Sequence, residues 1–311
     1  MLLLRHVQKA IKEKIDLIIC HHPLIFDSLD CLIEEHPGEK WIRDLVKNDI
    51  AVFVMHTNLD IADKGVSDAL ADIVGIDKKN RKILSVTDYE KLYKLKVFVP
   101  SEHLKKVMSA MFKAGAGHIG NYSECCFFSD GKGSFKPLKG THPYIGEKGK
   151  REYVDEYKLE LIVKEKDIEA VKNAMLNAHP YEEVAFDVFN LQNRGKKYGL
   201  GRYGKLNKKL KLSELAKKLK GKVKGDVTDK ELKMIAVSPG SGADLIKKVS
   251  DIGADAYITG DIKYHDQVTA QALGLSIIDM GHYKSEVCVL KVLNKYITGL
   301  YKDKLDVIIN A

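Results

Sequence analysis

The sequence has no long apolar run and no recognisable leader. Across its 311 residues, no stretch approaches the roughly 18 consecutive apolar residues that a membrane-spanning helix requires. The amino end, residues 1–6, has three leucines and then turns polar, which is too short for the apolar region of a signal peptide. We therefore expect a cytoplasmic protein with no membrane partner.

Cysteine is scarce and its spacing is irregular. The five cysteines form neither an even set nor a Cys-x-x-Cys pair, which disfavours both a disulfide framework and a structural zinc knuckle. Free cysteines are commonly buried packing residues. We expect all five to be reduced: Cys20, Cys31, Cys125, Cys126 and Cys288.

The charge balance is basic but mixed. A net charge of +8 could indicate nucleic acid or a phosphorylated ligand. However, the lysines lie among acidic residues on helical stretches such as 210–222, a pattern typical of solvated helix faces. No RNA-binding or helix-turn-helix signature accompanies the charge, so nucleic acid is not an expected partner.

Helical patterns lie between apolar runs of strand length in the outer parts of the chain. The runs cover residues 16–20, 50–55, 234–238, 256–259 and 275–278. The helical patterns cover residues 7–14, 41–47, 243–252 and 265–273. This alternation favours strand–helix units with largely parallel pairing. Residues 14–21 also resemble 253–260, which predicts two related αβ half-domains.

The middle of the chain has a different order of elements. A strand, a helix, two strands, a helix and a strand are predicted at 94–99, 101–114, 121–128, 156–163, 168–178 and 184–191, with a glycine-rich loop at 131–149. This order is ferredoxin-like. We predict an α/β fold with mixed or parallel sheets, comprising a discontinuous core of 1–92 and 193–311 and an inserted ferredoxin-like α+β domain of 93–192. Residues 193–204 are expected to form a flexible return.

Polar side chains collect just after four of the predicted strands, at the sheet edge where open α/β folds bind ligands. They are His21 and His22, then His56 and Asp60, then Asp261 and His265, and finally His282 and Glu286. A single histidine in such a place is more often a packed residue, but four such strand ends predict a metal site. Imidazole and carboxylate together suit zinc, iron, manganese or cobalt rather than calcium.

Spacing adds detail to this prediction. His282 and Glu286 are four residues apart, so they face the same way if a helix starts at Gly281. His21 and His22 diverge on a strand and can share a site only where the strand turns, which Pro23 makes plausible. A single carboxylate, Asp60, could bridge two ions.

Four motifs in order resemble the Nif-three-like dinuclear metal-centre family, whose members are labelled GTP cyclohydrolase 1 type 2 homologues. They cover residues 21–26, 56–60, 259–266 and 281–286, and the resemblance extends over essentially the whole chain. It implies that two divalent metal ions are held by His21, His22, Asp60, His282 and Glu286. It also implies a PII- or CutA-like insert and a hexameric, ring-like homo-oligomer.

The resemblance also bears on the amino end. It implies several dozen further residues there, including a Trp-Asp-Asn motif and a first strand. Met1 falls roughly where that strand would end. We expect either a misassigned start codon or a truncated chain.

Three functions remain open on these observations. The expected one is a metal-dependent hydrolase acting on a nucleotide or a phosphorylated small molecule, with His265 or His56 as catalytic proton carrier; the resemblance points to GTP. One alternative is a metal chaperone or insertion factor. The other is a regulatory protein that binds partners through the surface of its ring-like oligomer.

Three further features of the sequence are candidates for a supporting or binding role. Asp261 could orient a metal ligand. Residues 238–242 form either a phosphate cradle or a tight turn that needs glycine. In the insert, residues 115–121 and 179–183 form either a regulatory ligand or metal pocket or ordinary hairpin and helix-end structure.

Overall fold

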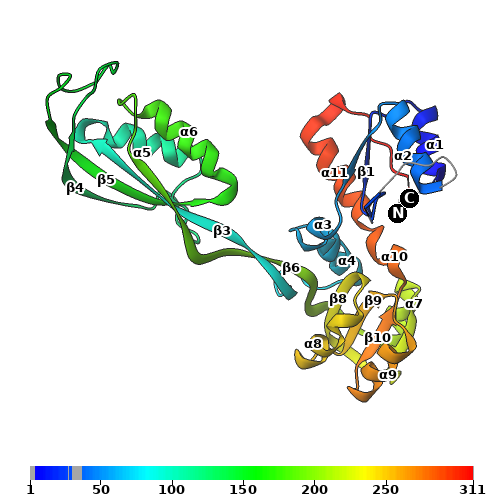
Figure 1. The fold of residues 1–311 in the computed structure, drawn as a ribbon. Coiled ribbons are helices and arrows are strands. Elements are labelled where there is room, and N and C mark those ends of the chain that lie inside the picture. Colours follow the sequence, from blue (N-terminus) through cyan, green and yellow to red (C-terminus); the bar gives the residue numbers. More distant parts are fainter. Residues whose placement is uncertain (1–3, 27, 30–36, 311) are drawn as a thin grey trace. The chain divides into compact units, whose positions relative to one another are not determined.

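The computed structural model describes residues 4–26, 28–29 and 37–310 (Figure 1). The chain divides into two compact units. The core unit comprises residues 1–87 and 198–311, and the inserted unit comprises residues 88–197. Two long strands, β3 (Lys82–Pro100) and β6 (Phe186–Lys211), carry the chain from one unit to the other. The boundaries expected at 93 and 192, and the identity of the insert, stay predictions.

A small parallel sheet begins the core unit. β1 (Leu17–Cys20) pairs with β2 (Ala51–Val54) along their full lengths. The helices α1 (Leu4–Lys12) and α2 (Pro37–Lys47) accompany it, and a buried apolar cluster holds this part together: Val7, Ala10, Leu45 and Ile50. Because the two strands are parallel neighbours, the residues that follow them meet at one edge.

A larger mixed sheet forms the rest of the core unit, with strand order β6-β8-β9-β10-β7. β8, β9 and β10 are parallel, whereas β7 and β6 run antiparallel to their neighbours. The new strands are β7 (Lys222–Gly225), β8 (Glu231–Ser241), β9 (Ala256–Gly260) and β10 (Ser276–Asp279).

The central strands of this sheet are buried on both faces. Along β9, Ala256 and Ile258 belong to one apolar cluster and Tyr257 to another. Continuous apolar runs are expected in such strands, because neither face meets water. The predicted α/β class with mixed sheets is confirmed in this coarse form.

Seven α-helices complete the core unit within the described residues. Those preceding the insert are α3 (Thr57–Ile61) and α4 (Val66–Val74). Those following it are α7 (Leu212–Leu219), α8 (Ile246–Asp251), α9 (Tyr264–Ala272), α10 (His282–Glu286) and α11 (Val289–Tyr301). Across the described chain, none of the helices combines the length and apolarity needed to cross a membrane.

The inserted unit follows the order β3-α5-β4-β5-α6-β6, with strands arranged β4-β5-β3-β6. Its own elements are α5 (Leu104–Lys113), β4 (Cys126–Phe135), β5 (Glu152–Lys164) and α6 (Ile168–Ala178). Both helices cover one face of the sheet (Figure 1), where Leu95, Met111, Leu159 and Met175 form a separate core. The alternate residues, Phe98 and its neighbour Lys158 among them, lie on the other face.

Two glycine-rich segments differ from expectation. β4 covers Cys126–Phe135, so the strand expected at 121–128 starts later and includes the first part of the predicted loop. A side chain at Gly133 would overlap the Glu156 carboxylate. The return expected to be flexible at 193–204 is part of β6, where a side chain at Gly199 would overlap the Ser85 carbonyl. In both places glycine permits close approach between strands rather than flexibility.

Candidate metal centre

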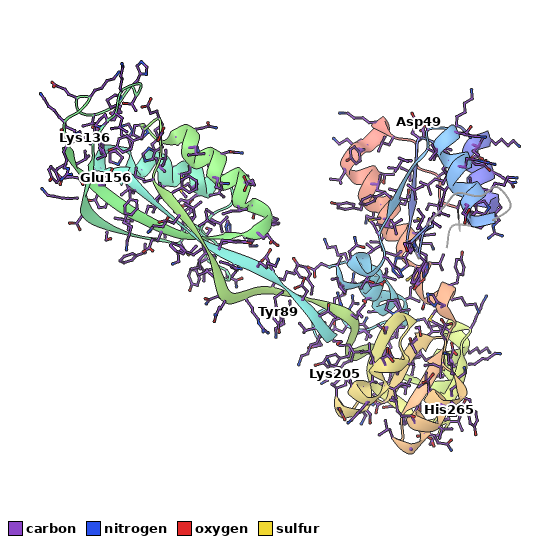
Figure 2. All side chains as sticks on the ribbon, viewed as in Figure 1. Asp49, Tyr89, Lys136, Glu156, Lys205 and His265 are labelled. Atoms are coloured by element: carbon purple, nitrogen blue, oxygen red, sulfur yellow. The ribbon has the colours of Figure 1, made fainter. Side chains whose placement is uncertain are left out.

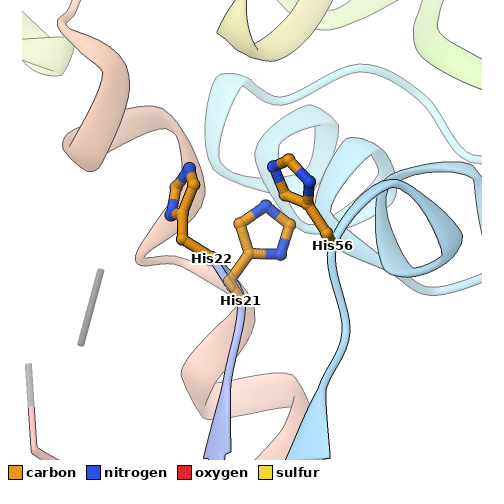
Figure 3. Close-up of side chains that lie close together, drawn as sticks. All are labelled: His21, His22 and His56. Atoms are coloured by element: carbon orange, nitrogen blue, oxygen red, sulfur yellow. The ribbon is translucent and has the colours of Figure 1, made fainter. Parts of the chain in front are cut away.

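Three histidines meet where the small parallel sheet ends. His21 and His22 follow β1, and His56 follows β2 (Figure 3). Each pair of ring centroids is 5.0–5.1 Å apart. The Met55 N–H donates to the Cys20 carbonyl at 2.9 Å, which extends the strand pairing by one step and sets His56 beside His21.

The carboxyl-terminal part of the core unit supplies the second half of the cluster. α10 begins at His282 and ends at Glu286, so both side chains lie on one face of the helix. His282 Nε2 lies 3.0 Å from Glu286 Oε1 and 3.1 Å from His22 Nε2. Residues from the two ends of the chain therefore share one site.

Asp60 completes the cluster from α3. Its Oδ1 lies 3.4 Å from His21 Nε2, and Glu286 Oε1 lies 3.6 Å from that same nitrogen. Glu286 Oε2 lies 3.6 Å from His22 Nε2. All five residues expected as metal ligands thus lie together.

The donor atoms form two overlapping groups. In the first, nitrogens of His21, His22 and His56 lie within 4.8 Å of one another, and in the second the same holds for His22, His282 and Glu286. His22 belongs to both groups. The sequence had marked His56 only as a proton carrier, although its position directly after β2 was a signal for a place among the donors.

Two hydrogen bonds orient the imidazole rings. His21 Nδ1 donates to the Met55 carbonyl at 2.7 Å, and His282 Nδ1 donates to Asp261 Oδ2 at 2.6 Å. A carbonyl or carboxylate can only accept, so the Nδ1 atoms carry the protons. The Nε2 lone pairs of both rings are then directed into the cluster, an arrangement typical of metal-binding histidines.

Several polar atoms in the cluster are buried without a hydrogen-bond partner. They are His21 Nε2, His22 Nδ1 and Asp60 Oδ1. Within the described part of the chain, neither Asp60 nor Glu286 pairs with a lysine or arginine, and their side chains are only 14% and 11% exposed. Two buried carboxylates without a cation are costly.

The pKa values reflect this crowding. Burial, helped by the nearby charge of Glu286, raises the pKa of Asp60 to about 6. Burial alone would also raise the pKa of Glu286, but the close approach of His21 and the charges of the surrounding histidines lower it. Burial lowers the pKa of His22 and that of His56, which favours the neutral, lone-pair-bearing imidazole that a metal requires.

Close backbone packing holds α10 against the sheet. Gly240 has φ of 63°, and a Cβ there would lie 2.7 Å from Glu286 Oε1. Its N–H donates to Ser285 Oγ at 2.8 Å, and that hydroxyl donates to the His282 carbonyl at 2.6 Å. Because this N–H is occupied, the glycine-rich segment 238–242 acts as a support for α10, which argues against the phosphate-cradle interpretation.

The structure does not bring His265 into the cluster. It is exposed at the start of α9, and its ring packs against Tyr264 with centroids 5.7 Å apart. Among the described residues, no hydrogen bond, ion pair or ring contact joins it to the histidines or carboxylates of the site. Figure 2 labels His265 on the core unit.

The donor set fits divalent metal ions. Imidazole nitrogens and carboxylate oxygens converge on shared space, several of them lack partners, and two negative charges have no cation. Zinc, iron, manganese and cobalt accept this mixture.

Comparisons with known proteins match nearly the whole chain. The model of the Duf34/NIF3 family (NGG1p interacting factor 3) matches residues 3–311. A Bacillus subtilis protein named GTP cyclohydrolase 1 type 2 homolog is 42% identical over 305 residues, covering 96% of this chain and 81% of the relative. A Halalkalibacterium halodurans protein of the same name is 40% identical, with the same coverage of both chains.

Solved structures share the fold. A Bacillus cereus protein related to NIF3 superposes with a TM-score of 0.82 at 36% identity, covering 98% of this chain and 86% of that one. A Staphylococcus aureus protein superposes with a TM-score of 0.69 at 28% identity, covering 99% of this chain and 84% of that one. The coverage includes both units.

Proposed function

This chain belongs to the Duf34/NIF3 family, and from that premise we propose that it is a dinuclear metal-dependent hydrolase. The proposed ligands of two divalent ions are His21, His22, Asp60, His282 and Glu286. The proposed substrate is a nucleotide or another phosphorylated small molecule. The relatives' name, GTP cyclohydrolase 1 type 2 homolog, supports this substrate class.

One observation carries the proposal. His22 Nε2 and His282 Nε2 face each other at 3.1 Å, with a Glu286 oxygen 3.0 Å from the latter. Hydrogen bonds satisfy the other nitrogen of His282 and of His21. A cation between these lone pairs and the buried carboxylates would remove the electrostatic cost of the cluster.

The chain's own residues would orient and serve the reaction. Bound divalent ions supply Lewis acidity and a hydroxide near neutral pH. Met55 and Asp261 fix the rings of His21 and His282, which preserves the geometry of the donors. His56, whose pKa is lowered by burial, would accept a proton in the site. His265, which is exposed and lies outside the cluster, is a second proposed proton carrier.

A metal carrier or insertion factor is the competing function. The exposure of the His282 side chain, 37%, favours it, because an accessible ligand assists exchange. A carrier should release its ions readily to a chelator and should show no turnover. A hydrolase should retain metal and lose activity in step with metal loss.

We further infer that the inserted unit is a ferredoxin-like domain of the PII or CutA kind. Its element order and its strand order β4-β5-β3-β6 support this. A hexameric ring, which the family resemblance implies, and a cytoplasmic location, which we expect from the lack of a long apolar run, remain parts of the proposal. Size-exclusion chromatography with light scattering would test the assembly.

Metal counting tests the central proposal. We expect elemental analysis of the purified chain to find about two ions per chain, as a dinuclear centre requires, and the Glu286→Ala variant to lose most of them. Glu231→Ala, which removes an exposed strand carboxylate paired with Lys209, serves as the matched control. A metal-free parent that cannot be loaded with zinc, manganese or cobalt would contradict the proposal.

Substrate turnover is tested on the loaded protein. A panel of GTP, other nucleoside triphosphates and phosphate monoesters would be followed by release of phosphate or formate, and cyclic nucleotides by formation of the nucleoside monophosphate. Turnover that disappears in Glu286→Ala supports the hydrolase. Full metal loading without turnover of any compound, combined with rapid transfer of the ions to a chelator, would favour the carrier.

A further inference from the structure

Asp261 and His282 form a hydrogen-bonded pair that orients one ring of the candidate metal centre, yet they come from two different loops. Asp261 follows β9, and His282 follows β10. These strands are parallel neighbours, and β10 pairs with β9 along its full length (Figure 1). The separation of the two partners therefore depends on what holds the loops just beyond the strand ends.

Asp279, the last residue of β10, is hydrogen-bonded to both loops. Its Oδ1 accepts the Gly281 N–H at 3.0 Å, and its Oδ2 accepts the Ile262 N–H at 3.3 Å. Gly281 directly precedes His282, and Ile262 directly follows Asp261. One carboxylate thus fastens the backbone beside each partner of the Asp261–His282 contact.

The bond to Gly281 also sets where α10 begins. An aspartate that accepts the N–H two residues further along the chain closes an Asx turn. The residue after this turn, His282, is the first of α10. Because the helix starts directly after the turn, the turn decides the direction in which α10 carries His282 and Glu286 into the site.

Lys224, on the edge strand β7, balances the charge of this carboxylate. β7 runs antiparallel to β10, and Lys224 lies opposite Ile277 in the register, so Asp279 is its diagonal neighbour on the same face. Lys224 Nζ lies 2.7 Å from Asp279 Oδ2 and donates to the Ile262 carbonyl at 2.6 Å. The Lys224–Asp279 pair thus holds both the N–H and the carbonyl of Ile262.

This ion pair differs from an ordinary surface salt bridge. The side chains of Lys224 and Asp279 are only 23% and 14% exposed, so water screens their attraction less than it screens an exposed pair. In addition, both side chains are bonded to backbone groups of the two loops. The pair therefore restricts where the loops can lie.

The loops that this pair holds serve one of the two groups of donor atoms. His282 shares a group with His22 and Glu286. The other group, His21, His22 and His56, follows the strands of the small parallel sheet. Loosening the loops beyond β9 and β10 should therefore disturb one ion position more than the other.

We propose that Lys224 and Asp279 are positioning residues of the metal centre, which set the Asp261–His282 contact and thereby the affinity of the ion that His282 binds. Neither residue is a ligand. The inference rests on the proposed function in one respect, namely that the cluster holds two divalent ions. It extends the machinery of the site to β7, a strand that supplies none of the proposed ligands.

The sign of the effect separates positioning from simple electrostatics. Lys224 is positively charged, so a role through charge alone would oppose the binding of a cation, and removing it would strengthen metal binding. Positioning predicts the reverse. Without Lys224, the Ile262 carbonyl loses a donor and Asp279 loses its counter-charge, so both loops are less restrained and the His282 ring is less well placed.

A cobalt titration of the metal-free, full-length protein, followed by visible absorption, tests the proposal. The parent should show two binding steps, and His282→Ala identifies the step to which that residue contributes. We expect Lys224→Met to weaken this step about tenfold, the lower end of the loss caused by removing a group behind a metal ligand, and to leave the other step unchanged. Lys224→Arg, which keeps the charge and the donors, should recover most of the affinity.

Lys222→Met is the matched control. Lys222 lies directly opposite Asp279 in the register of β7 and β10 and is exposed, and within the described part of the chain it forms no ion pair with that carboxylate. The variant removes the same charge from the same strand, so it should bind both ions as the parent does. Equal weakening in Lys222→Met and Lys224→Met would overturn the proposal.

The other outcomes are decisive as well. If Lys224→Met binds cobalt as the parent does, binds it more tightly or loses both steps alike, the positioning role is wrong. If circular dichroism shows that this variant does not fold, Lys224→Gln, which keeps a donor for the Ile262 carbonyl, is titrated in its place with the same selective loss expected. A parent that takes up no cobalt would contradict the proposed function and this inference together, whereas two steps in the parent and an unaffected variant would contradict this inference alone.

Discussion

Asp261 accepts a hydrogen bond from His282 Nδ1 at 2.6 Å, and it does so from a backbone with φ of 57°. Left-handed backbone is uncommon outside glycine and is tolerated best by asparagine and aspartate. The carboxylate therefore holds its position at the end of β9 with its oxygen against the ring. This contact fixes which nitrogen of His282 remains for the site.

We predict that Asp261→Asn weakens metal binding by about 10- to 100-fold, the usual effect of removing a carboxylate behind a ligating histidine. Asparagine tolerates the same backbone, so the fold should persist. A competition titration with a zinc-binding dye measures the change. Asp251→Asn, an exposed position at the end of α8, should leave the affinity unchanged, and equal loss in both variants would contradict the orienting role.

Gly240 offers a test of the packing behind α10. In Gly240→Ala, the new methyl group would lie 2.7 Å from Glu286 Oε1 and displace that carboxylate. Gly253→Ala is the matched control, because Gly253 also has positive φ, 71°, but nothing lies within 4 Å of the added atom. Both should lose about 1 kcal/mol from the backbone conformation.

Only Gly240→Ala should also lose metal. Chemical denaturation measures the shared loss of stability, and elemental analysis measures the difference between the two variants. If Gly240→Ala retained the metal content of Gly253→Ala, the close approach of this loop would have no part in placing Glu286.

Asp60 should destabilise the metal-free chain. Its side chain is 14% exposed and lies near the like charge of Glu286, and only the histidines of the cluster, not a lysine or arginine, lie beside it among the described residues. Asp60→Asn removes that charge, so we expect the metal-free variant to be more stable than the metal-free parent, on the order of 1–2 kcal/mol. Thermal unfolding with a chelator measures this gain.

With metal present, the parent should be more stable than Asp60→Asn. The parent gains stability from metal binding by mass action, whereas Asp60→Asn gains less because a ligand is missing. Thermal unfolding with added zinc measures both shifts. A variant that is less stable than the parent in both conditions would show that Asp60 has a structural partner instead.

Asp68, unlike Asp60, should stabilise the folded chain. Its Oδ2 lies 3.0 Å from Arg202 Nη2, and its Oδ1 lies 3.1 Å from Arg81 Nη1. Arg202 is only 3% exposed, so Asp68→Asn would leave a buried guanidinium short of its counter-charge. We expect a loss of about 3 kcal/mol or more in the free energy of unfolding, measured by urea denaturation.

This ion pair also predicts a pH dependence. Burial would raise the pKa of Asp68, but the hydrogen bonds and charge of Arg202 lower it below its ordinary value. A depressed pKa in the folded state stabilises the protein above the unfolded value of about 3.9. The contribution is lost as pH falls through the folded pKa. The stability difference between the parent and Asp68→Asn should therefore shrink below about pH 4, and a constant difference down to pH 2 would argue against the pair.

The sequence located the strand-end histidines that meet in the structure better than it predicted the glycine-rich segments. Strand-end histidines could be located because buried parallel strands are continuous apolar runs, so the polar residue that ends each run is visible. Residues 193–204 were misassigned because glycine signals both flexible loops and close strand contacts. The deciding neighbours, such as Ser85 beside Gly199, are far away in the sequence.

Contacts between residues that are far apart in the sequence could not be predicted either. Arg202 and Asp68 are 134 residues apart, and neither belongs to a motif that marks a pair. The inserted unit contains a cavity whose walls depend on how residues 135–145 fold over the sheet, which periodicity does not specify. Of the segment 179–183, Tyr181, Glu182 and Glu183 line that cavity, whereas residues 115–121 do not.

The shared position of His22 in the cluster has a consequence for biosynthesis. His22 and His282 are 260 residues apart in the sequence. Contacts between residues so far apart form slowly, because a long loop must close first. A chain still on the ribosome can complete the separate core of the inserted unit long before Glu286 has been synthesised. The side chains of this cluster can therefore come together only late in folding, after the core of the inserted unit has been able to form.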